Sequence, residues 1–108
     1  MTVQVYQDQQ GKEPFTEWIN SVKDRRTRAR IDSRLDRLQD GNFGDWKSLG
    51  GGLFEMRLQF GSGYRVYYGR EGENIIILLT GGDKGSQTRD IQKARQHWQD
   101  YQRRKQNE

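Results

Sequence analysis

The sequence predicts an α+β fold, in which helices and strands occupy separate stretches of the chain. Apolar residues recur at helical spacing twice between residues 14 and 39, and apolar–polar alternation then dominates between residues 54 and 79. A third helical pattern follows near the end. The predicted order is therefore strand, helix, helix, three strands, helix. The 108 residues suit one domain that spans residues 1–108.

Local signals mark the predicted elements of the first half. The first strand covers Val3–Tyr6, where valines alternate with polar residues. Pro14 suits a helix start, because the N–H that it lacks would be unpaired there. Asp24 can cap a second helix that runs to about Gln39. The apolar positions of the two helices are Phe15, Trp18, Ile19 and Val22, then Ile31, Leu35 and Leu38.

A hairpin is the clearest pattern in the second half. Alternating strands end at Phe60 and begin at Tyr64, which predicts a three-residue loop and places Leu58 opposite Val66. The continuous apolar run Ile75–Leu79 predicts a central strand that is covered on both faces. We expect the glycine-rich stretch Asn42–Gly52 to be a loop.

A turn at Gly81–Gly85 then precedes a final helix to about Arg104, and the tail Gln102–Glu108 is expected to fray. The predicted core residues are Trp18, Ile31, Leu35, Met56, Leu58, Val66 and Ile77.

Composition narrows the possible functions. The chain has no cysteine and one histidine, so zinc centres and Ser-His or Cys-His catalysis have little support, and we expect no metal or cofactor. The N-terminus lacks the features of a signal peptide and no apolar run is long enough to cross a membrane, which predicts a cytoplasmic protein. The net charge of +4 favours a polyanionic partner such as a nucleic acid.

The first candidate site is the polar face of the hairpin, with Glu55, Arg57, Gln59, Arg65 and Tyr67. The predicted register pairs Gln59 with Arg65 and Arg57 with Tyr67. Arginine forks could bind phosphate there while the tyrosine stacks on a base. The alternative interpretation is a solvated face with ordinary cross-strand pairs.

Three other features favour structural roles. The glycines of Gly81-Gly82-Asp83-Lys84 would let backbone N–H groups approach an anion, but the pattern favours a simple strand-ending turn. His97, which lies near the apolar stripe of the final helix, is expected to have a packing or surface role. The arginines of the second helix are expected to form a solvated, ion-paired face with nearby aspartates. These arginines are Arg25, Arg26, Arg28, Arg30, Arg34 and Arg37.

The chain resembles the RelE/ParE toxin superfamily, and most closely its HigB-like addiction module killer branch. The resemblance covers nearly the whole sequence. It rests on Pro14-Phe15-x-x-Trp18, the arginine-rich second helix, Gly41-Asn42-Phe43-Gly44-Asp45, Leu53-Phe54-Glu55-Met56-Arg57, Gly63-Tyr64-Arg65-Val66-Tyr67-Tyr68 and Gly81-Gly82-Asp83-Lys84.

This resemblance implies a RelE-like fold, with a four-stranded sheet packed on a helical hairpin and the active surface on the opposite face. It implies messenger RNA cleavage at the ribosome without metal, by attack of a 2′-hydroxyl on the adjacent phosphate. Arg57, Arg65 and Lys84 match catalytic positions. Glu55 could be the general base, and Asp83, Lys84 or Tyr67 could also transfer protons. The residues expected to bind the RNA are Lys47, Gln59, Tyr67 and Asp83.

The same resemblance implies a helix-turn-helix antitoxin as partner, with operator DNA bound only through the toxin–antitoxin complex. Two other functions share this fold. One is inhibition of DNA gyrase by a ParE-like protein, and the other is an inactive toxin-like protein that acts only as antitoxin partner.

Overall fold

A computed structural model describes residues 1–108 and confirms the α+β class. The elements are β1 Thr2–Val5, α1 Pro14–Ser21, α2 Arg25–Gln39, β2 Asp45–Gly50, β3 Leu53–Arg57, β4 Arg65–Glu71, β5 Ile75–Gly82, the 3₁₀ turn η1 Lys84–Ser86 and α3 Gln87–Gln106. The sheet has five strands in the order β1-β5-β4-β3-β2, so the prediction of four strands is wrong. β1 runs parallel to β5, and the other neighbouring strands are antiparallel.

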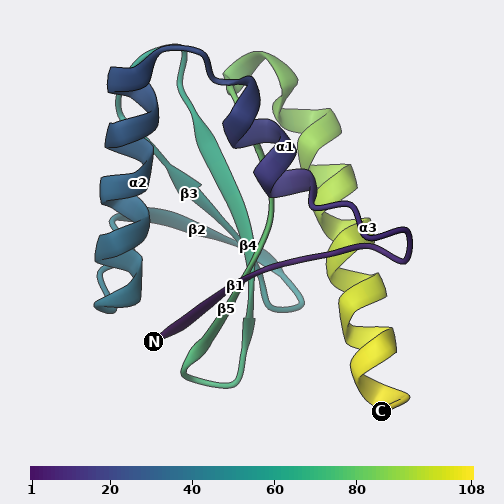
Figure 1. Ribbon diagram of the computed structural model, residues 1–108. Helices are drawn as coiled ribbons and strands as arrows, with labels where there is room; N and C mark the ends of the chain where they lie inside the picture. Colours follow the sequence, from purple (N-terminus) through teal and green to yellow (C-terminus); the bar gives the residue numbers. More distant parts are fainter.

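Helices cover both faces of the sheet, since α1 and α2 share one core with it and α3 forms a second core with it. Figure 1 shows the strands between α2 and α3. The α1/α2 side packs around residues that include Phe15, Ile31 and Met56. The α3 side packs around residues that include Tyr67 and Trp98. The active surface was expected on this second side, so α3 restricts which of its polar residues a ligand can reach. None of the helices is long and apolar enough to span a membrane.

The predicted hairpin exists, but its register is shifted by two residues. Arg57 lies opposite Arg65 and Met56 opposite Val66, in place of the predicted pairs of Gln59 with Arg65 and Leu58 with Val66. A shift of two residues keeps every side chain on its face, so the apolar pattern cannot distinguish the two registers. The connection is wider than predicted, since β3 ends at Arg57 and β4 begins at Arg65.

β2 was predicted as part of a loop, and that prediction is wrong. This strand lies at the edge of the sheet, and all its residues except the half-buried Leu49 are exposed. A strand with almost no buried residue has no apolar alternation to reveal it. Gly50, Gly51 and Gly52 have φ angles of 88°, 64° and 84°, and this left-handed backbone, which glycine adopts most readily, turns the chain from β2 into β3.

Three further features differ from the prediction. β5 is an inner strand, but the central position belongs to β4. α3 includes most of the tail that was expected to fray, because basic residues suit the C-terminal end of a helix and Arg104 pairs with Asp100 at 2.9 Å. Gly81 and Gly82 belong to β5 and not to a turn. A Cβ at Gly81 would lie 2.2 Å from Cε3 of Trp18, so glycine makes room for this ring.

The core agrees with most of the prediction. Ile31, Met56, Leu58, Val66 and Ile77 are buried, whereas Trp18 and Leu35 are only partly buried at the edge of the α1/α2 core.

Replacing Leu58 with alanine is expected to lower the free energy of unfolding by about 2 to 5 kcal/mol, because the side chain is buried and its removal leaves a cavity. Leu58 is 3% exposed and belongs to the α1/α2 core. Denaturant unfolding of both proteins measures the difference. A loss below about 1 kcal/mol would show that this end of the hairpin is loosely packed.

Candidate functional site

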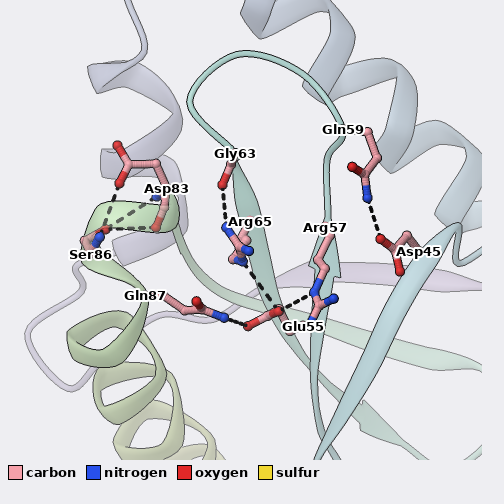
Figure 2. A network of polar contacts seen from close by, with 9 residues as sticks. All are labelled: Asp45, Glu55, Arg57, Gln59, Gly63, Arg65, Asp83, Ser86 and Gln87. Carbon is pink, nitrogen blue, oxygen red and sulfur yellow. Dashed lines mark hydrogen bonds and ion pairs between the residues drawn. The ribbon is translucent and has the colours of Figure 1, made fainter.

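Glu55 lies at the centre of a polar cluster on the α3 side of the sheet (Figure 2). Its side chain is completely buried. Nε of Arg57 donates a hydrogen bond to Oε1 of Glu55 at 3.0 Å, and Nε of Arg65 lies 3.5 Å from the same oxygen. Nε2 of Gln87 donates to Oε2 at 3.0 Å. Side chains from β3, β4 and α3 therefore converge on one carboxylate, and these four residues are called the Glu55 cluster below.

The strand register brings the two arginines together. Arg57 on β3 lies directly opposite Arg65 on β4, so both side chains occupy the same face of the sheet. This confirms the prediction that they share a face. Two like charges in this position would repel each other, and the carboxylate between them offsets that repulsion.

Both arginines keep donors available for a ligand. Nη1 of Arg65 donates to the carbonyl oxygen of Gly63 at 2.8 Å, whereas the Nη groups of Arg57 make no hydrogen bond within the protein. The side chain of Arg57 is 38% exposed and that of Arg65 is 13% exposed. A guanidinium with free N–H groups can bind two oxygens of a phosphate at once. The pair is therefore suited to an anionic ligand.

The arginines also determine the charge of Glu55. Burial by itself raises the pKa of Glu55, but hydrogen bonds from Arg57 and Gln87 and the charge of Arg65 outweigh it and lower the pKa below its ordinary value. In the free protein this carboxylate is therefore ionised near neutral pH and holds the arginines in place.

Acid is expected to destabilise the protein partly through Glu55. A carboxyl whose pKa is lower in the folded state stabilises the fold above its unfolded pKa, about 4.3, and this contribution is lost as pH falls through the folded value. Unfolding of wild type and Glu55→Gln across pH 2 to 7 measures this effect. The stability difference between the two proteins should shrink below about pH 4.3. A constant difference would show that the cluster does not perturb Glu55.

Lys84 lies beside the loop of the hairpin. Its backbone N–H donates to the carbonyl oxygen of Ser62 at 3.4 Å. A Cβ at Gly63 would lie 3.2 Å from Cβ of Lys84 and 3.4 Å from Nη1 of Arg65, so the lysine starts close to that guanidinium. Its side chain is exposed and makes no hydrogen bond or ion pair. The structure therefore places Lys84 at the border of the Glu55 cluster.

Tyr67 lies next to the cluster but does not form an open surface. It lies opposite Glu55 on the neighbouring strand, on the same face of the sheet, and is completely buried beneath α3. Its hydroxyl group is buried without a hydrogen-bond partner. Burial, followed by the charges of Glu55 and Asp90, raises the pKa of Tyr67. The expectation that this ring stacks on a base from the surface is therefore wrong, because α3 covers the ring.

The Gly81–Lys84 segment has a structural role for most of its length. The carboxylate of Asp83 accepts hydrogen bonds from the amides of Gly85 and Ser86, at 2.9 and 3.2 Å, and so caps η1. A Cβ at Gly82 would collide with the carboxylate of Asp90. Gly81 and Gly82 thus allow close packing, and neither exposes backbone N–H groups that could bind an anion.

Lys47 and Gln59 border the cluster from the opposite side. Lys47 lies opposite Glu55 on β2, which puts its exposed side chain on the same face. Gln59 follows β3, and its Nε2 donates to Oδ2 of Asp45 at 2.5 Å. Sequence reasoning missed Gln87, which reaches Glu55 only because α3 crosses this face, and no spacing in the sequence indicates that contact. His97 is half-buried and lies against the ring of Tyr6, as the packing interpretation predicted.

Comparison with known proteins gives the family. The family described as "Phage derived protein Gp49-like" matches residues 17–99, a span that contains the whole Glu55 cluster. The chain belongs to the Gp49-like family. A Haemophilus influenzae protein that carries the name "Uncharacterized protein" is 47% identical over 81 residues, which are 75% of this chain and 82% of that protein. Gp49-like proteins are toxin-like, of RelE/HigB type, and occur in toxin–antitoxin systems. An antitoxin partner follows from this membership.

Proposed function

We propose that this Gp49-like protein is a cytoplasmic type II toxin of the HigB-like branch that cleaves messenger RNA without metal, and that residues 1–108 act as one toxin domain. The observation that supports the nuclease is the convergence of two arginines on one carboxylate oxygen, at 3.0 and 3.5 Å. Groups that reach a single oxygen can also reach a single phosphate. A phosphate bound beside this carboxylate would meet two cations whose remaining N–H groups can donate hydrogen bonds to it.

The proposed reaction is attack of the 2′-oxygen on the adjacent phosphorus. The bond from phosphorus to the 5′-oxygen breaks, which leaves a 2′,3′-cyclic phosphate and a 5′-hydroxyl group. Negative charge accumulates on the phosphorane oxygens, and Arg57 and Arg65 stabilise that charge. By analogy with oxyanion donors, each contact contributes about 10²- to 10³-fold to the rate.

Two proton transfers complete the reaction. We assign the 2′-hydroxyl proton to Glu55, whose carboxylate would lie beside the bound phosphate. The added negative charge would raise the pKa of Glu55 and would weaken its pairing with the arginines, so the carboxylate becomes a better base when RNA is bound. Lys84 is exposed at the border of the cluster and would donate a proton to the departing 5′-oxygen.

RNA would enter along the outer side of the cluster, since α3 covers Tyr67. Lys47 and Gln59 are exposed there and would contact the RNA strand. The proposed context is the ribosome, where messenger RNA is single-stranded. The proposed partner is a helix-turn-helix antitoxin, and the complex of the two would bind operator DNA.

The test maps RNA ends after brief expression of the toxin and after incubation of the purified protein with messenger RNA, with and without ribosomes. New 2′,3′-cyclic phosphate and 5′-hydroxyl ends are expected from wild type. Cleavage by the purified protein only when ribosomes are present would establish ribosome dependence. Growth arrest without RNA ends, together with inhibition of gyrase supercoiling, would replace the nuclease with the gyrase-inhibitor function, and neither effect would indicate an inactive antitoxin partner.

A further inference from the structure

A basic groove of about 460 Å³ lies between α2 and the outer end of the β2–β3 hairpin. Its lining includes Arg30, Arg34 and Arg37 of α2, together with Arg57, Asp45 and Phe60. The three helix residues recur at spacings of four and three, which puts them on one side of α2. They span about 10 Å along the helix axis, at about 1.5 Å per residue. These three arginines thus form a stripe of positive charge along one wall of the groove.

The arginines of this groove have no acidic partners on their own helix. We expected the α2 arginines to pair with nearby aspartates, but none of them forms an ion pair, and that expectation is wrong. The guanidinium of Arg30 lies over the ring of Phe60 at 4.1 Å, and Nε of Arg34 is buried without a hydrogen-bond partner. Asp45 is the only acidic residue in the lining, and it accepts a hydrogen bond from Gln59. The positive charge is therefore largely uncompensated.

Arg57 connects this groove to the Glu55 cluster, because it lines the groove and also binds Glu55. A strand whose phosphate lies on Arg57 and Arg65 can continue directly along α2. Phe60 is the only hydrophobic residue of the lining, so an amphipathic helix of a protein partner would find almost no apolar contact. Guanidinium groups suit phosphates and the faces of unstacked bases. These features favour a single-stranded nucleic acid as the occupant.

We propose that the α2 groove binds the RNA backbone on one side of the cleaved bond, with phosphates on Arg30, Arg34 and Arg37. This inference rests on the proposed function for its substrate and extends the site from one phosphate to several. A stripe of about 10 Å is longer than the step between neighbouring phosphates of one strand, so it can face at least two of them. The groove therefore contributes affinity, while the Glu55 cluster contributes the chemistry.

The test compares two double variants with equal changes in net charge. Arg30→Gln with Arg37→Gln removes two arginines of the groove. Arg25→Gln with Arg28→Gln removes two exposed arginines from the other side of α2, outside the groove. The probe is a fluorescent single-stranded RNA made of 2′-O-methyl nucleotides, which lack the attacking hydroxyl. Fluorescence anisotropy measures affinity between 50 and 300 mM salt, and melting temperatures establish that each variant is folded.

The groove variant is expected to bind about 25-fold more weakly at 0.1 M salt. Each lost phosphate contact removes about 0.7 from the slope of log affinity against log salt, so the slope should fall by about 1.4. The control variant should keep the affinity and slope of wild type. Equal losses of RNA affinity in both variants would show that the groove acts only through the overall positive charge of the protein, and not as a specific site. Unchanged RNA binding in the groove variant, with or without loss of antitoxin binding, would overturn the inference.

A failure of the groove proposal can be distinguished from a failure of the proposed nuclease function. Wild type that binds the probe through the groove but cuts no cleavable RNA would contradict the nuclease while the groove stands. Wild type that cuts RNA, with a groove variant that binds the probe normally, would contradict the groove alone.

Discussion

Replacing Arg65 with alanine is expected to abolish growth arrest and to lower the rate of RNA cleavage by about 10²- to 10³-fold. Arg65 is 13% exposed, lies on the α3 side of the sheet and reaches the same carboxylate oxygen as Arg57. Alanine removes one of two cations that would stabilise the phosphorane. Stability should fall less, by about 1 to 3 kcal/mol, because Glu55 keeps its hydrogen bonds from Arg57 and Gln87.

The measurement combines growth arrest, mapped RNA ends and melting temperature for matched variants. Arg70→Ala is the control, since Arg70 lies on the same strand but faces Phe43 on the α2 side, with 4.6 Å between its guanidinium and the ring centroid. That variant should cleave RNA normally. Arg65→Lys keeps the charge but loses the planar fork, and should recover only part of the rate. A folded Arg65→Ala protein that cleaves RNA at the wild-type rate would remove Arg65 from the catalytic set.

Replacing Glu55 with alanine is expected to have the largest effect on stability, a loss of about 3 to 5 kcal/mol in the free energy of unfolding. The side chain is completely buried, and its removal leaves Arg57 and Arg65 opposite each other without the carboxylate that joins them. Gln87 would also lose its partner, which weakens the contact between α3 and the sheet.

Glu55→Gln separates shape from charge, because glutamine fills the same space and can still accept a hydrogen bond. We expect this variant to fold with a smaller loss of stability, yet to cleave RNA slowly, since the amide is not a base. Denaturant unfolding and single-turnover cleavage measure the two effects. If Glu55→Gln retained the full rate of cleavage, Glu55 would be a positioning residue and another group would take the 2′-hydroxyl proton.

The apolar pattern alone determined most of the elements. Helical spacing after Pro14 and Asp24 predicted both N-terminal helices, and alternation predicted β3 and β4 with the correct faces. The placement of Arg57 and Arg65 on one face followed from the same alternation. Side chains that must be buried leave a periodic trace in the sequence, whatever the exact register.

The tertiary structure decided the features that leave no such trace. The edge strand β2 is almost entirely exposed, so only its hydrogen bonds to β3 define it. The register of the hairpin depended on the conformation of its loop, because a shift of two residues costs no burial. It nevertheless decides that Arg57 faces Arg65 and not Tyr67.

The charge pattern of the sequence was also insufficient to predict which charged residues form ion pairs. Aspartates lie within α2 and at both of its ends, which favoured ion pairs with the α2 arginines. The structure forms no such pair, and three of these arginines line the groove. The sequence alone determined that the chain is basic and that its arginines are most concentrated in α2. Only the packing of α3 on the sheet decided that Tyr67 is buried and that Gln87 completes the Glu55 cluster. Contacts between residues 32 positions apart depend on how elements cross, and no local pattern encodes that geometry.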